Sequence, residues 1–294
     1  MDKKTVFLHI GLPKTGTTTF QTTVMRSPHV MLSHGIRYLE TGTKLGVNAE
    51  HHLLVQGILG PRGARIDTLA SEEILAGIWA AARREIDTAP ESKILISSEL
   101  FSLEIRKLED IVRLRRELCD YNVVIALVLR DVADFVNSLY LQRVVEGYYE
   151  PIEATIEEFS NFLNWSDLTE KWASVFGREN VRVLRYEDLD RSRLAGHMLE
   201  HLVDIKLTDG QLTDVSGNFS LGKAAAEFVL ALNRSAMPEP AKRRLRSVVV
   251  EALARFDTGM KRSEFVDDEM ADVLRSRCEW PLLAAKPLRN MATS

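Results

Sequence analysis

The stretch FLHIGLPKTGTTTFQ, residues 7–21, indicates how the chain begins to fold. A short apolar run leads into Gly11, and Gly16 follows at the spacing of the phosphate-binding loop G-x-x-x-x-G-K-[ST]. Thr17 stands where that motif has its lysine, and the only lysine of the stretch is Lys14, inside the loop. The pattern predicts a strand, a tight glycine turn and a helix that begins near Gly16.

This predicted strand, turn and helix would bind an anion. Backbone N–H groups and the positive end of a helix dipole would point to one spot, and Pro13 would stiffen the entry to the turn. A run of threonines adds hydroxyl donors, namely Thr15, Thr17, Thr18 and Thr19. The alternative is a threonine-rich helix start after an ordinary β-turn.

Composition limits the class of protein. The chain has 294 residues, of which 45% are hydrophobic, enough for one large α/β domain or two small ones. A net charge of -4 provides no general attraction for nucleic acid, so we expect no nucleic-acid partner and read the basic residues at 242–246 as a solvated helix face. Cys119 and Cys278 are too few for a disulfide framework, which is typical of a reducing compartment. With no apolar run of about 18 residues, we expect a cytoplasmic protein without a transmembrane segment.

Short apolar runs alternate with helical patterns, which predicts βαβ units around a largely parallel sheet. The expected strands are residues 5–10, 93–97, 123–129 and 181–184. Helical stripes predict two core faces: Leu75, Ile78, Trp79, Ala82 and Ile86 on one helix, and Ile105, Leu108, Val112 and Leu118 on another. We expect an α/β, P-loop-like fold of three layers, in which helices flank a central, mainly parallel sheet.

The chain is expected to form a single domain over residues 1–294. Residues 5–190 would hold the ligand framework, and residues 191–294 would add a helical part, notably at 223–233 and 241–256. The glycine-rich region at residues 42–67 predicts a mobile loop, the kind of segment that often carries an acceptor site.

The six residues PKTGTT, 13–18, resemble the 5′-phosphosulfate loop of sulfotransferases that use 3′-phosphoadenosine 5′-phosphosulfate, a family with bacterial and carbohydrate-modifying members. In that family the lysine matching Lys14 assists departure of the phosphate as the sulfuryl group moves to an acceptor. The resemblance implies a transferase with this nucleotide as co-substrate and no metal. It assigns donor binding to Lys14, Thr15, Gly16, Thr17 and Thr18.

A second anion site is implied because this donor carries a 3′-phosphate. Arg130 ends a predicted strand, and Ser138 follows eight residues later on the next helix. This arrangement resembles the family's 3′-phosphate motif, in which a forked guanidinium and a hydroxyl hold one phosphate. The alternative for Arg130 is a surface salt bridge with Asp131 or Asp134.

The stretch VRVLRYEDL, residues 181–189, resembles the strand and turn after which the family places an adenine-contacting aromatic side chain, matching Tyr186. The alternative is a buried tyrosine at an ordinary strand exit. The family's C-terminal arginine-lysine-glycine element, which also holds the 3′-phosphate, is not present as such. Gly222 and Lys223, after NFSL, are a candidate replacement.

Sulfuryl transfer to a hydroxyl needs a base that takes the acceptor proton. Glu99 directly follows a predicted buried strand, where active sites of α/β proteins are built. It matches the place, in the order of elements, of the catalytic histidine of the cytosolic sulfotransferases. Partial burial is expected to raise its pKa. The alternative is helix capping by Ser98 or Ser102, with Glu99 as a first-turn acid.

Three further residues are candidate bases. His51 and His52 lie in the predicted loop, and Glu40 matches the position of the base in glycan-modifying sulfotransferases that use glutamate. We rank Glu99 first, then His52 and Glu40. The expected acceptor is a hydroxyl of a glycan, a glycolipid or a small molecule.

Two other functions stay open from the sequence. In a P-loop kinase or NTPase, Asp131 would bind Mg²⁺ after a hydrophobic strand, but the lysine after the second glycine is missing. A non-catalytic nucleotide-binding module of the same fold is the other alternative. The sequence does not predict the oligomeric state.

Overall fold

A computed structural model of the chain describes residues 3–43, 49–60, 71–208, 210–215, 221–256 and 265–281. The chain divides into two units, which we describe separately. The first unit comprises Met1–Arg130, Trp165–Gly217 and Trp280–Ser294, and the second comprises Asp131–Asn164 and Asn218–Glu279. The assignment of one domain to residues 1–294 stays a prediction.

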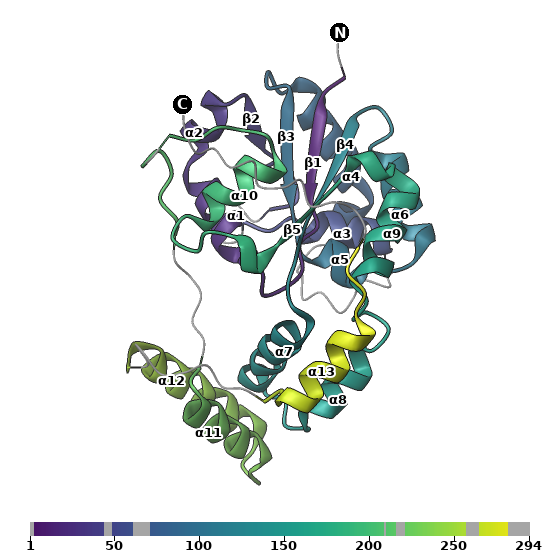
Figure 1. Cartoon of the computed structure of the whole chain (residues 1–294). Helices are drawn as coiled ribbons and strands as arrows, with labels where there is room; N and C mark the ends of the chain where they lie inside the picture. The colour runs from purple at the N-terminus through teal and green to yellow at the C-terminus, as the bar shows by residue number, and fades with distance from the viewer. Residues whose placement is uncertain are drawn as a thin grey trace. The chain divides into compact units, whose positions relative to one another are not determined.

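The first unit is built on a five-stranded, all-parallel sheet with strand order β2-β3-β1-β4-β5 (Figure 1). The strands are β1 (Thr5–His9), β2 (Ile36–Tyr38), β3 (Lys93–Ser97), β4 (Asn122–Leu129) and β5 (Val181–Arg185). The central strand is β1, where Leu8 is opposite Ile96 on one side and Ile125 on the other. The predicted α/β fold with a parallel sheet is confirmed, and so are its four expected strands.

Both faces of the sheet are covered because its strands are apolar on both sides. One face packs with α1 (Thr17–Arg26), α2 (Pro28–Ser33) and α10 (Leu194–Leu202) in a single hydrophobic cluster. On the other face, α9 (Trp165–Phe176) packs against β4 and β5. Figure 1 shows this arrangement, with α4 (Glu72–Thr88) and α6 (Leu108–Glu117) on the side of α9. The three layers are therefore helix, sheet and helix.

The predicted helix faces are partly right. On α4, Ile78, Trp79, Ala82 and Ile86 are buried as predicted, whereas Leu75 is half-buried. On α6 the prediction was wrong for Leu108, whose side chain is 52% exposed. The helix begins only at Leu108, so its core face consists of Ile111 and Leu114 and continues into Leu118.

The region 42–67 was predicted to be a loop, but it contains the helix α3 (His52–Leu59). Residues 44–48 and 61–67 of that region lie outside the described residues. A Cβ atom on Gly57 would lie 2.4 Å from Cγ2 of Ile78, so glycine permits close packing of α3 against α4. The described part of the expected loop is therefore largely a buried helix.

The second unit is helical (Figure 1). Its helices are α7 (Val132–Glu146), α8 (Ile152–Phe159), α11 (Lys223–Arg234), α12 (Glu239–Phe256) and α13 (Asp268–Arg277). Helix α7 contacts α8, α11 and α13, and α12 packs on α11. The expectation of a solvated basic face was wrong for Arg246, which is buried and pairs with Glu239 and with Oδ1 of Asn233.

Candidate functional site

The loop between β1 and α1 has an unusual backbone. Lys14 has φ 65°, and among the described non-glycine residues only Asp204 shares a positive φ. This left-handed conformation costs a residue with a Cβ about 1–2 kcal/mol. Gly16 has φ 81°, and a Cβ atom there would lie 2.3 Å from Cδ2 of Leu194. Glycine at this position is thus required by backbone conformation and by packing.

Two of the loop threonines close the loop on itself. The hydroxyls of Thr15 and Thr17 donate to the carbonyl of Leu12 at 2.6 and 3.3 Å. A hydroxyl has one proton to donate, so in this arrangement neither threonine offers one to an anion. Thr18 is exposed, and its side chain remains at the surface of the helix start. The hydroxyl protons of Thr15 and Thr17 are therefore used within the loop, and the role of these residues in binding the donor stays a prediction.

The N-terminal end of α1 presents backbone N–H groups that have no partner within the helix. The first hydrogen bond of the helix runs from Phe20 N–H to the carbonyl of Gly16 at 3.0 Å. The N–H groups of Thr17, Thr18 and Thr19 precede that bond and therefore have no acceptor within the helix. No acidic residue lies in the first turn. The helix start thus retains the positive character that binds phosphate groups.

Arg130 lies against this loop. It directly follows β4, is 3% exposed, and donates from Nη1 to the carbonyl of Lys14 at 3.0 Å. Its own carbonyl accepts a hydrogen bond from Nε1 of Trp165 at 2.8 Å. Arg130 is thus buried at the carboxyl end of the sheet. Its guanidinium group contacts the backbone of the loop at residues 10–16, which the sequence predicts to bind phosphate and which we call the phosphate loop.

Tyr186 joins the same group of residues. The guanidinium carbon of Arg130 lies 5.1 Å from the centroid of the tyrosine ring, and that of Arg191 lies 5.3 Å from it. Cε2 of Tyr186 is 3.7 Å from the position of a Cβ on Gly16. The ring is 7% exposed and belongs to the core cluster, as in the buried-tyrosine alternative. Contact with adenine stays a prediction.

The remaining residues predicted for the 3′-phosphate belong to the second unit. Ser138 lies on α7, and Gly222 and Lys223 begin α11. Because Arg130 belongs to the first unit, its convergence with these residues on one phosphate stays a prediction.

Asp131, the Mg²⁺ ligand of the kinase alternative, caps α7. Its Oδ1 accepts from the N–H groups of Ala133 and Asp134 at 3.1 and 3.2 Å. Arg275 donates to the same carboxylate at 2.9 Å. Burial acts to raise the pKa of Asp131, but the hydrogen bonds from Arg275 and the backbone outweigh it and lower the pKa. The carboxylate is therefore satisfied by protein groups.

Ser97, the last residue of β3, connects the phosphate loop to the candidate bases. Its hydroxyl lies 2.7 Å from Nδ1 of His9 and accepts from Nε2 of Gln21 at 3.1 Å. Its carbonyl accepts from the N–H of His51 at 3.0 Å. His9 and Gln21 lie before and after the phosphate loop, so one serine joins both sides of the site.

His51 is a structural residue. It is fully buried, its Nε2 donates to the carbonyl of Leu39 at 2.7 Å, and its Nδ1 accepts from the N–H of Ser97 at 3.1 Å. Burial lowers the pKa of His51 to about 4, although the backbone carbonyls of Leu39 and Ser97 beside the ring nitrogens act to raise it. With both ring nitrogens used, His51 is not free to take a proton from an acceptor.

His52 and Glu99 share a neighbour, Ser98. The hydroxyl of Ser98 lies 3.0 Å from Nδ1 of His52 and accepts from the N–H of Leu100 at 3.2 Å. Glu99 occupies the N-cap position of α5 (Leu100–Glu104), and its Oε2 is buried without a hydrogen-bond partner among the described residues. Ser98 thus caps this helix start, as in the alternative, but Glu99 keeps one carboxylate oxygen unused.

The sequence analysis missed Glu50. Oε2 of Glu50 is also buried without a hydrogen-bond partner in the described part of the chain. Burial raises the pKa of Tyr38 well above its ordinary value, and the charges of Glu50 and then Glu99 act in the same direction. Both carboxylates are therefore close to Tyr38. The only sequence signal for Glu50 was its position beside the histidine pair.

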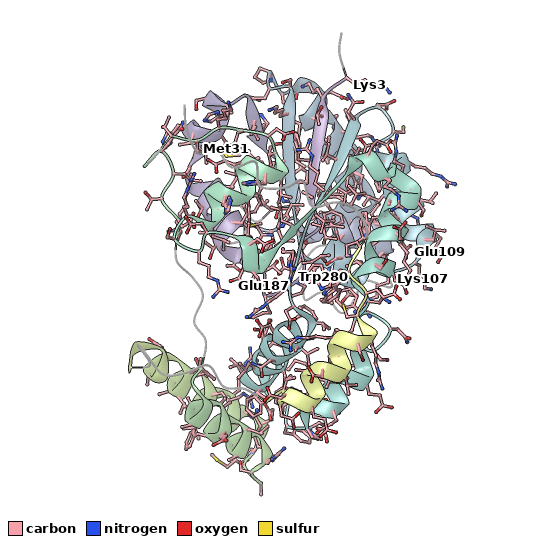
Figure 2. All side chains as sticks on the ribbon, in the orientation of Figure 1. Lys3, Met31, Lys107, Glu109, Glu187 and Trp280 are labelled. Atoms are coloured by element: carbon pink, nitrogen blue, oxygen red, sulfur yellow. The ribbon has the colours of Figure 1, made fainter. Side chains whose placement is uncertain are left out.

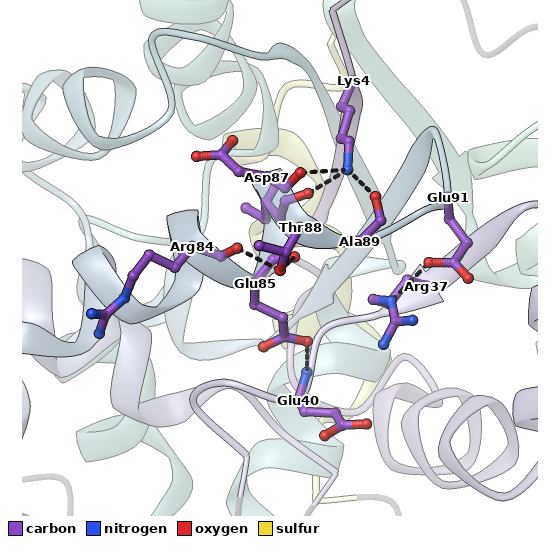
Figure 3. A network of polar contacts seen from close by, with 10 residues as sticks. Lys4, Arg37, Glu40, Arg84, Glu85, Asp87, Thr88, Ala89 and Glu91 are labelled. Atoms are coloured by element: carbon purple, nitrogen blue, oxygen red, sulfur yellow. Dashed lines mark hydrogen bonds and ion pairs between the residues drawn. The ribbon is translucent and has the colours of Figure 1, made fainter.

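Glu40 is placed differently from the other candidates. Figure 3 shows its backbone N–H donating to Oε1 of Glu85, at 2.8 Å, in a polar network on α4. Thr41 donates to the other oxygen of the same carboxylate at 2.8 Å from its N–H. Glu40 is exposed, and this network fixes its backbone rather than its carboxylate.

The comparisons with known proteins give one solved structure to report. No protein-family model matches the chain, and no curated protein matches it. A sulfotransferase from Alicyclobacillus acidocaldarius is 15% identical, with a TM-score of 0.44, over 85% of this chain and 95% of that chain. This likeness is too weak to indicate an activity, so the proposal below depends on the residues themselves.

Three further findings concern the described ranges only. No helix there is both long and apolar enough to cross a bilayer. No group of three or more His, Cys, Asp or Glu side chains in these ranges is arranged to hold a metal ion. Cys119 is exposed, Cys278 is buried, and neither is in a disulfide bond within these ranges.

Proposed function

We propose that the chain is a cytoplasmic sulfotransferase that transfers a sulfuryl group from 3′-phosphoadenosine 5′-phosphosulfate to an acceptor hydroxyl of a glycan, a glycolipid or a small molecule. The observation that carries the proposal is the hydrogen bond from Arg130 to the carbonyl of Lys14. It brings together two residues that the sequence predicted to bind the two ends of one bisphosphate nucleotide.

The residues present fit this donor. Two positive side chains, Lys14 and Arg130, belong to segments that meet at the start of α1, where N–H groups precede the first helical hydrogen bond. The N–H groups of Thr17, Thr18 and Thr19 would hold the 5′-phosphate, and Arg130 would hold the 3′-phosphate. When bound, the donor supplies the sulfuryl group and the leaving phosphate.

Lys14 would stabilise the leaving group. Its position inside the loop, before the helix begins, supports a contact alongside a phosphate at the start of α1 rather than beyond it. Its positive charge would offset the negative charge that develops on the bridging oxygen. The left-handed backbone at Lys14 supports a functional reason for lysine here, because glycine would adopt this conformation without strain.

Glu99 is the proposed base, with His52 second. The buried Oε2 of Glu99 has no hydrogen-bond partner among the described residues, so it is available to accept a proton. His52 is available if its Nδ1 donates to Ser98, because Nε2 then carries the free lone pair. The opposite tautomer would place the proton on Nε2 and leave Glu99 as the base.

Nucleotide titration tests the proposal. Calorimetry with 3′-phosphoadenosine 5′-phosphate and with Mg²⁺-ATP would measure the affinity of the wild-type chain, Lys14→Ala and Arg130→Ala. We expect the bisphosphate to bind more tightly than Mg²⁺-ATP, and each substitution to weaken it by about tenfold or more. A preference for Mg²⁺-ATP would contradict the proposal.

A sulfation assay tests turnover. Purified protein, labelled donor and fractionated glycan, glycolipid and small-molecule pools would identify the acceptor by its gain of sulfate. Lys14→Ala is the comparison variant, because it lacks the proposed leaving-group contact, and thermal unfolding would show that its fold is intact. Sulfate transfer that is equal in both proteins would argue against the proposed role of the loop.

A further inference from the structure

Two arginines lie over one tyrosine ring. The guanidinium carbons of Arg130 and Arg191 are 5.1 and 5.3 Å from the ring centroid of Tyr186. Arg130 is buried and touches the phosphate loop, whereas Arg191 is exposed, in the segment between η3 (Tyr186–Asp188) and α10. All three residues belong to the first unit. Their shared ring places two positive charges on one small part of that unit.

The charge of Arg191 is not neutralised by the neighbouring acid. The Oδ1 atom of Asp190 accepts from the N–H and the hydroxyl of Ser192 at 2.9 and 2.6 Å. Across the described residues, Arg191 forms no ion pair within 4.0 Å of a carboxylate. Two like charges beside one ring repel each other, and an anion bound between them would offset the repulsion.

The low exposure of the Tyr186 ring limits the contacts that a ligand can make with it. Tyr186 is 7% exposed and two guanidinium groups lie over its ring, so little of the ring is open for a base to stack on. A tyrosine in this position holds arginines in place through cation–π contacts. The arginines, not the ring, present the groups that a ligand would meet.

We propose that Arg191 and Arg130 form one subsite for a phosphate monoester, the 3′-phosphate of the donor, with Tyr186 as the support that positions both. This inference rests on the proposed function. It supplies, from the first unit, a second cationic group for the 3′-phosphate, which the sequence analysis sought in Gly222 and Lys223. Forked guanidinium groups bind phosphate oxygens in pairs, so two of them suit a dianionic monoester.

The test compares ligands with and without the 3′-phosphate. Calorimetry would measure binding of 3′-phosphoadenosine 5′-phosphate and of adenosine 5′-monophosphate to the wild type, Arg191→Ala and Arg191→Lys. We expect Arg191→Ala to lower the preference for the bisphosphate by about tenfold and to leave affinity for the monophosphate unchanged. Arg191→Lys keeps the charge but not the fork, so its preference should lie between the two.

Arg185→Ala is the matched control. The guanidinium carbon of Arg185 lies 4.5 Å from the ring centroid of Trp280, which is labelled in Figure 2. The control therefore removes one exposed positive charge and one arginine–aromatic contact, as Arg191→Ala does. We expect it to change neither affinity, and thermal unfolding of each variant would show that the fold is intact.

The outcomes separate this inference from the proposed function. If the wild type prefers the bisphosphate and Arg191→Ala keeps that preference, the Arg191 subsite is wrong and the proposed function stands. If Arg191→Ala weakens both nucleotides equally, Arg191 acts through general electrostatics and the subsite is likewise wrong. If the wild type binds no bisphosphate, both proposals fall.

Discussion

Nη1 of Arg130 donates a hydrogen bond to the carbonyl oxygen of Lys14 at 3.0 Å, although 116 positions separate the two residues in the sequence. The contact holds the backbone of the phosphate loop at the residue with the left-handed conformation. Arg130 therefore has a structural role in the loop in addition to its proposed role in binding. Its substitution should affect stability and binding together, so the cleaner tests use other residues.

Substitution of Lys14 separates chemistry from backbone strain. We expect Lys14→Ala and Lys14→Gly each to lower kcat by about a hundredfold or more, because both remove the charge that stabilises the leaving group. Lys14→Gly should be more stable to urea than Lys14→Ala by about 1 kcal/mol, since φ is 65° there. Equal urea stability of the two variants would show that the loop relaxes its backbone without cost.

Three glycines form a graded test of packing. Gly16→Ala should lower the free energy of unfolding by about 2 kcal/mol or more, because φ is 81° and the Cβ would lie 2.3 Å from Leu194. Gly35→Ala, with φ 68° and nothing within 4 Å, should lose about 1 kcal/mol. Gly77→Ala, inside α4 and equally open, should gain up to about 1 kcal/mol. Urea unfolding measures all three, and a Gly16→Ala loss no larger than that of Gly35→Ala would contradict the crowding at Leu194.

The proposed base is tested by isosteric substitution. We expect Glu99→Gln to lower kcat by about a hundredfold or more, with unchanged affinity for 3′-phosphoadenosine 5′-phosphate, because only proton removal is lost. Glu104→Gln, on the same short helix, is the control and should retain activity. If His52→Gln produces the larger loss, the roles of Glu99 and His52 are exchanged.

Stability should fall in acid because two histidines are buried in the neutral form. Burial lowers the pKa of His9 to about 3 and that of His51 to about 4, from 6.5 in the unfolded chain. Their contribution to the free energy of unfolding is therefore complete above pH 6.5, and it is lost as the pH falls toward about 4 for His51 and about 3 for His9. Each histidine should lower the free energy of unfolding by about 1.4 kcal/mol per pH unit in this range.

NMR and unfolding measurements check this acid sensitivity. The ring protons of His9 and His51 should not titrate between pH 8 and about 5. His9→Gln should reduce the pH dependence of urea stability. A titration midpoint near 6.5 for His9 or His51 would show that the ring is hydrated and the prediction is wrong.

The sequence predicted the parts of the fold that are locally encoded. Residues 93–97 are apolar enough to be recognised as a buried strand without knowledge of their partners. Strand β2 was missed because its three residues, Ile-Arg-Tyr, form no run, and its pairing with β3 defines it. Helix α3 was missed because it is apolar on most sides and shows no clear stripe.

The sequence predicted which residues of the candidate site follow the ends of strands, but not their contacts. Lys14 and Arg130 follow adjacent parallel strands, so their proximity follows from the sheet order. His51 is held by the backbone of Ser97, whereas His52 lies beside the side chain of Ser98. This difference in their hydrogen bonds was not predictable, because the two histidines are adjacent in the sequence and so are the two serines. Arg191 lies in a segment without periodicity, and only its contact with the ring of Tyr186 singles it out.

The central position of β1 constrains the order in which the chain acquires its structure during synthesis. The phosphate loop is made before its neighbours Ser97, Arg130 and Leu194. Because every strand pairing in the described ranges is parallel, no hairpin there can hold β1 in the meantime. The loop can therefore reach its final form only after Leu194 has been translated, and until β3 and β4 are made the nascent β1 is an unpaired apolar strand that a chaperone would recognise.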